Sequence, residues 1–182
     1  MGTLNAIYVR AADAQTVAAL IAEQPTAYTE PGTDFFAIDR SIDDFRCPER
    51  QLAEISARLD TDVIWLSFQS VVDAFQFYHW RAGHHLRSLI YGSFEQERTW
   101  ERVEGTSEIW ERQALFEASR LEIGLKYARD AAEERELQRI YRDLELTAGS
   151  TEPSINARES ARKVAECYRL PGWFLEEGSG DD

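Results

Sequence analysis

Cysteine is scarce in this 182-residue chain: Cys47 and Cys167 are far apart, and neither belongs to a CxxC pair. Two isolated thiols argue against a disulfide-stapled scaffold, so we predict two reduced, structural cysteines. No apolar run reaches about 18 residues, so we expect no membrane span. The N-terminal stretch lacks a basic segment followed by an apolar one, so we expect no signal peptide and a cytoplasmic protein.

Basic residues are also few: the chain has 20 Lys and Arg but 33 Asp and Glu, which gives a net charge of −13. The imbalance is spread along the chain: residues 1–60 hold 5 basic and 10 acidic side chains, residues 61–116 hold 5 and 8, and residues 117–182 hold 10 and 15. Binding to nucleic acid needs a basic patch, which is missing. The negative charge can attract a basic protein partner, or it can simply keep the protein soluble.

The common catalytic signatures are absent as well. The chain contains no GxSxG, GxxxxGK[ST], GxGxxG or HExxH sequence and no EF-hand loop. These absences exclude only the enzymes that depend on such motifs. We predict no catalytic residue and no cofactor.

What the sequence does contain is an aromatic centre, residues 63–105, with three of the five tryptophans and all three histidines. Apolar residues occupy both alternating sets over Val63–Phe68, which is typical of an interior strand. Gly83 is the only strong turn former between Phe75 and Tyr91, so we predict a hairpin centred on Ala82 and Gly83.

A two- or four-residue loop fixes the pairing of that hairpin. It sets Arg81 against His84 and Trp80 against His85, and then His79 against Leu86, Tyr78 against Arg87, Phe77 against Ser88 and Phe75 against Ile90. One face then carries Phe75, Phe77, His79, Leu86 and Ile90, and the other carries Tyr78, Trp80, His85, Arg87, Leu89 and Tyr91. A three-residue loop would change this register.

The remaining sequence predicts elements around this meander. We expect a strand at Leu4–Arg10, a helix from Asp13 to Gln24, a hairpin turning at Pro31-Gly32, a helix after Pro48, a charged edge strand at Glu95–Glu104, a helix capped by Ser107, a long helix at Glu117–Leu146 and a last helix capped by Asn156 with Glu159. The fold class is therefore α+β. An antiparallel or mixed sheet of about five to seven strands, with its aromatic meander at 62–105, is packed by C-terminal helices at 107–175. Residues 1–175 form one domain, and the acidic tail 176–182 is disordered.

Two sets of side chains are candidates for binding. Tyr78, Trp80, His85, Arg87 and Tyr91 offer stacking surface, a titratable ring and a guanidinium, which suits a small ligand or a peptide. The plainer interpretation is that helices cover these residues. His79 and His84 are weak candidates for a metal site, because a catalytic zinc usually needs three protein ligands and spacing identifies no third.

Three functions remain compatible with the sequence. The favoured one is a non-catalytic acidic binding protein, of inhibitor, immunity or adaptor type, that docks a basic protein partner. The alternatives are a small-ligand-binding domain that uses the aromatic and arginine face, and a metal-dependent hydrolase at His79 and His84. The sequence leaves the oligomeric state open and predicts neither a nucleic acid nor a membrane as a partner.

Overall fold

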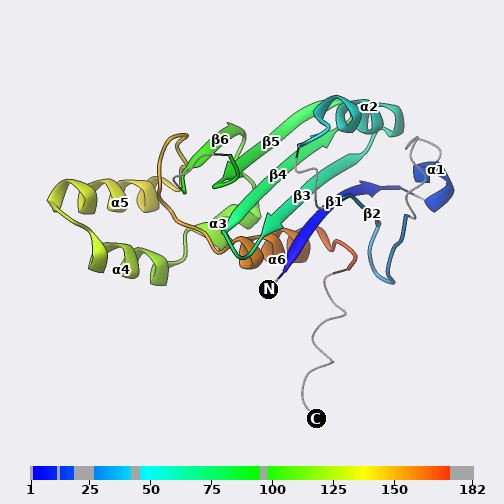
Figure 1. The fold of residues 1–182 in the computed structure, drawn as a ribbon. Helices are drawn as coiled ribbons and strands as arrows, with labels where there is room; N and C mark the ends of the chain where they lie inside the picture. The colour runs from blue at the N-terminus through cyan, green and yellow to red at the C-terminus, as the bar shows by residue number, and fades with distance from the viewer. Residues whose placement is uncertain (1, 12, 19–26, 42–45, 95–97, 173–182) are drawn as a thin grey trace, which may run out of the picture.

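Figure 1 shows the fold in a computed structural model that describes residues 2–11, 13–18, 27–41, 46–94 and 98–172. Trp173, the predicted tail 176–182 and the second half of the helix predicted from Asp13 to Gln24 lie outside these residues. Among the described residues, no helix combines the length and the apolar character needed to cross a bilayer.

Six strands form one antiparallel sheet, in the order β2-β1-β3-β4-β5-β6. The strands are β1 (Thr3–Arg10), β2 (Phe35–Asp39), β3 (Asp62–Gln69), β4 (Ala74–Arg81), β5 (His84–Tyr91) and β6 (Trp100–Gly105). This confirms the predicted α+β class and the aromatic meander, which is β3 to β6. The interior place of β3 and the edge place of the charged strand β6 are confirmed too, although β6 begins at Trp100 and residues 95–97 of the predicted strand Glu95–Glu104 lie outside the described residues.

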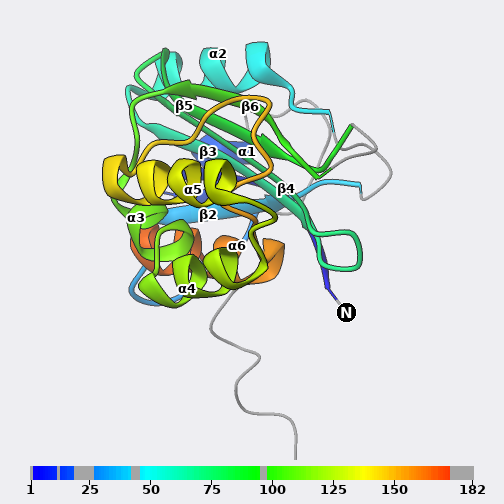
Figure 2. The same cartoon turned by 90° about the vertical axis from the view of Figure 1, so that its left-hand side faces the viewer.

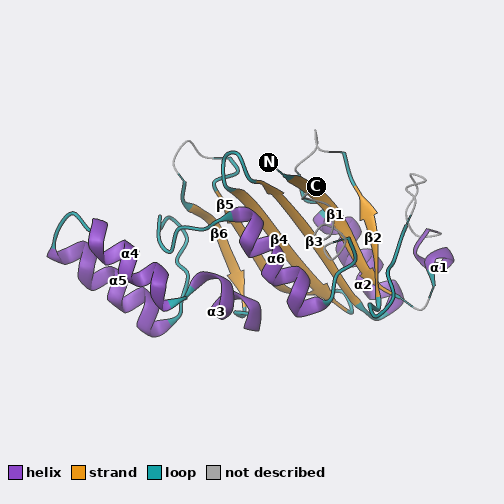
Figure 3. Cartoon of the chain, turned by 90° about the horizontal axis from the view of Figure 1, so that it is seen from below, coloured by secondary structure: helices purple, strands orange, loops and turns teal. Residues whose placement is uncertain are grey.

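Helices cover the sheet on both faces (Figures 1 and 3). The helices of the described chain are α1 (Ala14–Ala18), α2 (Glu49–Leu59), α3 (Ile109–Leu115), α4 (Ala118–Tyr127), α5 (Ala131–Asp143) and α6 (Ala157–Tyr168). On one face α3 and α6 bury Trp110, Leu115 and Val164 against Phe75 and Phe77. On the other face α2 packs Leu52 and Ile55 against Trp65 and Trp80. Because β3 supplies side chains to both layers, its two alternating sets are apolar.

The β4–β5 hairpin turns where the sequence predicts, with Ala82 at φ +50° and Gly83 at φ +79°. Arg81 pairs with His84 and Trp80 with His85, but a bulge between His79 and Trp80 then shifts the register. His79 faces Arg87, Tyr78 faces Ser88, Phe77 faces Leu89 and Phe75 faces Tyr91. The predicted register beyond His85 is therefore wrong. A bulge adds one residue to one strand and so exchanges the faces of the residues that follow.

Two predictions about the helices also need correction. The helix cap predicted at Ser107 is formed by Glu108, which exchanges hydrogen bonds with Glu111 in a capping box. The long helix predicted over Glu117–Leu146 is two helices, because the chain turns after Tyr127 and Asp130 caps α5 through the amides of Ala132 and Glu133. The last helix begins as predicted, with the Asn156 side chain accepting from the Glu159 amide.

The helices α4 and α5 lie side by side and form a helical arm, residues 118–143, that stands out beyond β6 (Figures 1 and 2). None of the residues of α4 is buried. At the base of the arm, Phe116 packs edge-on against Tyr141, with ring centroids 5.7 Å apart, and Phe116 and Leu146 rest on the core. The arm is therefore attached mainly at its base and presents much of α4 to solvent.

We expect Gly124→Ala to strengthen this arm. A methyl group at position 124 would lie 3.4 Å from a Leu137 methyl carbon, which is an ordinary contact distance. Because alanine is favoured over glycine inside a helix, the free energy of unfolding should rise by about 0.5–1 kcal/mol in urea titrations followed by circular dichroism. Gly149→Ala, at φ +84° in open space, is the matched control and should lose stability. A destabilised Gly124→Ala would contradict the packing of α4 on α5.

Candidate functional site

The five residues predicted to form a binding face are divided between the two layers of the core. Tyr78 and Trp80 pack on the α2 side, and Tyr91 packs on the α3 and α6 side. These three and Arg87 are at most 4% exposed, which leaves His85 as the exposed member. The bulge explains the division, because it moves Arg87 and Tyr91 to the opposite face from Tyr78. Their binding role stays a prediction, and their contacts in the folded chain are with the core.

Arg87 forms a buried ion pair with Glu111, the third residue of α3. Its Nε and Nη2 donate to the two carboxylate oxygens of Glu111 at 2.8 and 2.6 Å, and both side chains are at most 3% exposed. Nη1 donates to the backbone carbonyl of Gly105 at 2.9 Å. The guanidinium therefore fixes α3 to the edge of the sheet, and a two-pronged geometry of this kind is among the strong hydrogen-bonding arrangements.

His79 lies at the centre of a second buried polar cluster. Its Nε2 is 3.0 Å from an Asp62 carboxylate oxygen, and its Nδ1 is 2.7 Å from Glu108. Tyr168 of α6 donates to the other Glu108 oxygen at 2.5 Å. Arg81 donates to Asp62 at 2.6 Å. One imidazole thus joins the sheet to the start of α3 and, through Glu108, to α6.

The cluster favours a charged histidine. Both ring nitrogens face carboxylate oxygens, and only the doubly protonated ring donates from both. Burial opposes that charge, but the hydrogen bonds to Asp62 and Glu108 outweigh it and raise the pKa of His79. Burial also opposes the Asp62 charge, yet the bonds from His79 and Arg81 hold the pKa of that carboxyl well below its usual range.

This arrangement suits a structural role better than catalysis or metal binding. His79 is 2% exposed and both of its nitrogens are engaged, so a substrate proton has no path to it. His84, its predicted companion, is exposed at the hairpin turn. Within the described ranges, no three His, Cys, Asp or Glu side chains are placed to hold a metal ion. Both cysteines are free, as predicted, and burial raises the pKa of the Cys47 thiol.

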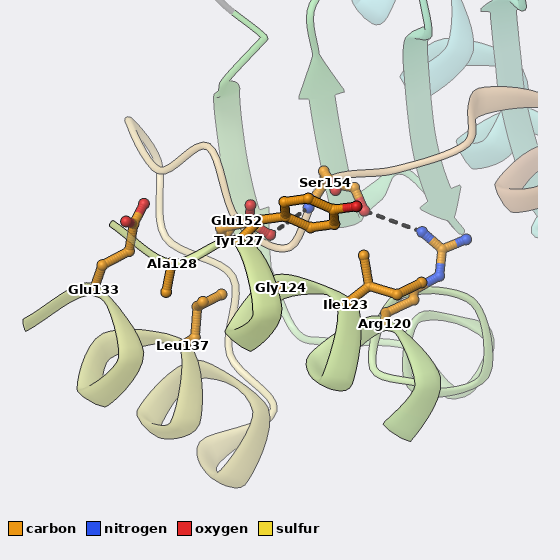
Figure 4. A pocket seen from close by; sticks show the side chains of 9 residues that line it. All are labelled: Arg120, Ile123, Gly124, Tyr127, Ala128, Glu133, Leu137, Glu152 and Ser154. Atoms are coloured by element: carbon orange, nitrogen blue, oxygen red, sulfur yellow. Dashed lines mark hydrogen bonds between the residues drawn. The ribbon is translucent and has the colours of Figure 1, made fainter. Parts of the chain in front are cut away.

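An open groove lies between the helical arm and the strand-edge loop, residues 147–156 (Figure 4). Its volume is about 480 Å³. The lining consists of Arg120, Ile123, Gly124, Tyr127, Ala128, Glu133, Leu137, Glu152 and Ser154. Ile123 and Tyr127 lie one helical turn apart on α4 and are 60% and 72% exposed. Two large apolar side chains beside a concave surface are typical of an interaction site.

The loop side of the groove is held firmly to the sheet. The Trp100 indole nitrogen donates to the Pro153 carbonyl at 3.0 Å, and the Trp100 backbone bonds to Gly149 and Ser150 at 2.8 Å each. Across the groove, Arg120 of α4 donates to the Ser154 carbonyl at 3.1 Å. The groove is therefore framed by hydrogen bonds and has a defined shape.

Sequence reasoning missed this groove because it treated α4 and α5 as one helix. The apolar stripe that predicts that helix runs through Leu121, Leu125 and Leu137, whereas Ile123 and Tyr127 fall off the stripe. An apolar pair four residues apart on the polar side of a helix was the available signal. The strand-edge loop was recognised only as a linker, so nothing in the pattern placed it opposite α4.

Comparison of the chain with protein-family models, with curated proteins and with solved structures finds no match.

Proposed function

We propose that this protein is a non-catalytic, acidic protein-binding domain, of inhibitor, immunity or adaptor type, whose groove holds a basic, apolar segment of a partner protein. The observation that carries the proposal is the exposure of Ile123 and Tyr127 along a framed groove. A partner that covers Ile123 or Tyr127 removes apolar surface from water. This burial stabilises the complex by about 25 cal/mol for each Å² covered.

An open groove fits a polypeptide better than a small molecule. Small-ligand sites usually enclose most of their ligand, whereas Ile123 and Tyr127 remain largely in solvent. A helix or an extended segment lying along α4 covers both residues at once, because side chains one turn apart face the same way.

The charge of the chain selects among possible occupants. At −13, two copies of this chain repel each other, whereas a basic partner is attracted and steered to the encounter. We therefore favour a basic partner over a second copy. A cytoplasmic location, where free thiols such as Cys47 and Cys167 stay reduced, belongs to the same proposal.

Photocrosslinking tests the proposal. A photoreactive phenylalanine analogue placed at position 127, in the native host, should give a crosslinked protein, because the ring of Tyr127 lies at the groove. The same analogue at Val71 is the matched control, since Val71 is 66% exposed in the β3–β4 turn and does not line the groove. Adding Ile123→Arg to the position-127 variant should abolish the crosslink, because it places a bulky cation in the groove.

Support for the proposal depends on the sequence of the peptide that is crosslinked. The crosslinked peptide, identified by mass spectrometry, should carry apolar residues flanked by Lys or Arg. Equal crosslinking at positions 127 and 71, or crosslinking unaffected by Ile123→Arg, would refute the groove as a docking site. A crosslink to a second copy of the chain would replace the basic partner with a homodimer.

A further inference from the structure

We infer that Glu152 is the residue in the groove that recognises a Lys or Arg side chain of the docked segment. This inference rests on the function proposed above and adds the contact that would give that function its specificity. Glu152 lies in the strand-edge loop and lines the groove together with Tyr127 and Ile123 (Figure 4).

The Glu152 carboxylate is held in position by its own loop. The Ser154 amide donates to one carboxylate oxygen at 3.0 Å. The Ser150 hydroxyl donates to the Glu152 carbonyl at 2.8 Å and accepts from the Glu152 amide at 3.0 Å. The next residue, Pro153, is fixed by Trp100. A carboxylate anchored in this way loses little conformational freedom when it binds a cation.

Among the described residues, Glu152 also differs from Glu133, the other acid that lines the groove, in having no cationic partner. Glu133 pairs with Arg129, Glu136 with Arg139 and Asp143 with Arg142. Among the described residues, Glu152 forms no ion pair, and one of its oxygens accepts no hydrogen bond. Arg120, the cation that lines the same groove, bonds to the Ser154 carbonyl instead. The charge of Glu152 acts on the neighbouring Tyr141. Burial is the largest cause that raises the pKa of Tyr141 to about 12, and the Glu152 charge is the second.

The surroundings of Glu152 suit a long basic side chain. Ile123 and the ring of Tyr127 offer apolar surface for the methylene stem, while the carboxylate accepts from the charged head. Lys126 already lies 5.6 Å from the centre of the Tyr127 ring, so the ring tolerates a cation beside it. A segment with an apolar residue next to Lys or Arg therefore matches the groove in both shape and charge.

Two synthetic peptides test this inference directly. Both carry Leu at helical spacing and a fluorescent label, one with Lys and one with Glu at the remaining positions. Fluorescence anisotropy at physiological salt measures the dissociation constant of each for the wild-type protein, for Glu152→Gln and for Glu122→Gln. Glu122 is exposed on α4 and does not line the groove, so its variant changes the net charge equally and serves as the matched control. Circular dichroism checks that all proteins are folded.

We expect the Lys peptide to bind the wild type at least about ten-fold more tightly than the Glu peptide, and Glu152→Gln to remove about ten-fold of that affinity. Glu122→Gln should change it by less than about two-fold. Glu152→Lys should favour the Glu peptide. Similar losses in the two glutamine variants would mean that only overall charge matters and would overturn the inference.

The same assay, with an Ile123→Arg variant added, separates the role of Glu152 from the proposed function. If both peptides bind equally, lose binding with Ile123→Arg and are unaffected by Glu152→Gln, the groove docks apolar segments without recognising a cation. The groove would then stand as a docking site for apolar segments, whereas the preference for a basic segment and the role of Glu152 would be refuted. If neither peptide binds at concentrations up to about 1 mM, the inference fails, and the crosslinking result alone decides the proposed function.

Discussion

Replacing Arg87 with methionine is expected to lower the free energy of unfolding by about 3–5 kcal/mol. The substitution leaves the Glu111 carboxylate buried and without its guanidinium, in a site where Glu111 is 1% exposed. It also removes the donor to the Gly105 carbonyl. Urea titration at neutral pH measures the loss. Arg102→Met is the matched control, because Arg102 and its partner Glu49 are 28% and 44% exposed, and it should cost less than about 1 kcal/mol.

The loss in Arg87→Met should shrink in acid. Burial already raises the pKa of Glu111 against the opposing hydrogen bonds from Arg87, and without the guanidinium that pKa should rise further, so a proton can neutralise the carboxylate. Below that raised pKa the folded variant gains a proton and recovers part of its stability. Adding Glu111→Gln to Arg87→Met should restore part of the stability at neutral pH. A deficit that is equal at pH 5 and pH 8, and unchanged by Glu111→Gln, would show that lost packing, not the uncompensated charge, sets the effect.

Removing the His79 imidazole is the second large expected effect. His79→Gln should destabilise the fold by about 2–4 kcal/mol below pH 6.5, because Asp62 and Glu108 lose a charged donor between them. Asp62 keeps Arg81, and Glu108 keeps Tyr168, which limits the loss. His84→Gln is the control at an exposed position of the same hairpin and should leave stability within about 0.5 kcal/mol of wild type.

The pH dependence of wild-type stability should report the same cluster. The folded pKa of His79 is raised above 6.5, so its contribution is fully present below pH 6.5 and is lost as pH rises through the folded value. The folded pKa of Asp62 is lowered, so its contribution is present above the ordinary value of 3.8 and is lost as pH falls through the folded value. The wild-type advantage over His79→Gln should therefore decline with rising pH above 6.5. An advantage that is independent of pH would mean that the pKa of His79 is the same in the folded and unfolded protein, and one that grows with pH would mean that His79 is neutral when folded.

Local sequence patterns predicted much of the sheet for identifiable reasons. The alternating apolar residues of β3 placed it in the interior, and the charges around Arg102 placed β6 at an edge. Gly83 located the hairpin turn because its position requires a positive φ. Asn156 marked the start of α6 because its side chain caps the Glu159 amide. Each of these signals depends on neighbours within a few residues, so a single sequence contains it.

The candidate sites needed contacts that no local pattern encodes. His79 meets Asp62 and Glu108 across 17 and 29 residues of chain, and Arg87 meets Glu111 across 24. The bulge beside His79 reversed the face of Arg87, and the alternation of side chains along β4 and β5 gave no sign of it. The groove required the chain to turn after Tyr127 and required Trp100 to hold Pro153 opposite α4.

The sequence by itself determined the fold class, the strand order of the meander and the net charge, since these follow from side-chain periodicity, turn residues and composition. Only the tertiary structure decided which polar groups are buried together and which apolar groups remain exposed. The physical reason is that burial belongs to the packed molecule. Ile123 and Tyr127 are apolar residue types that usually lie in a core, but here they are exposed. Arg87 and Glu111 are charged residue types that usually lie on the surface, but here they are buried.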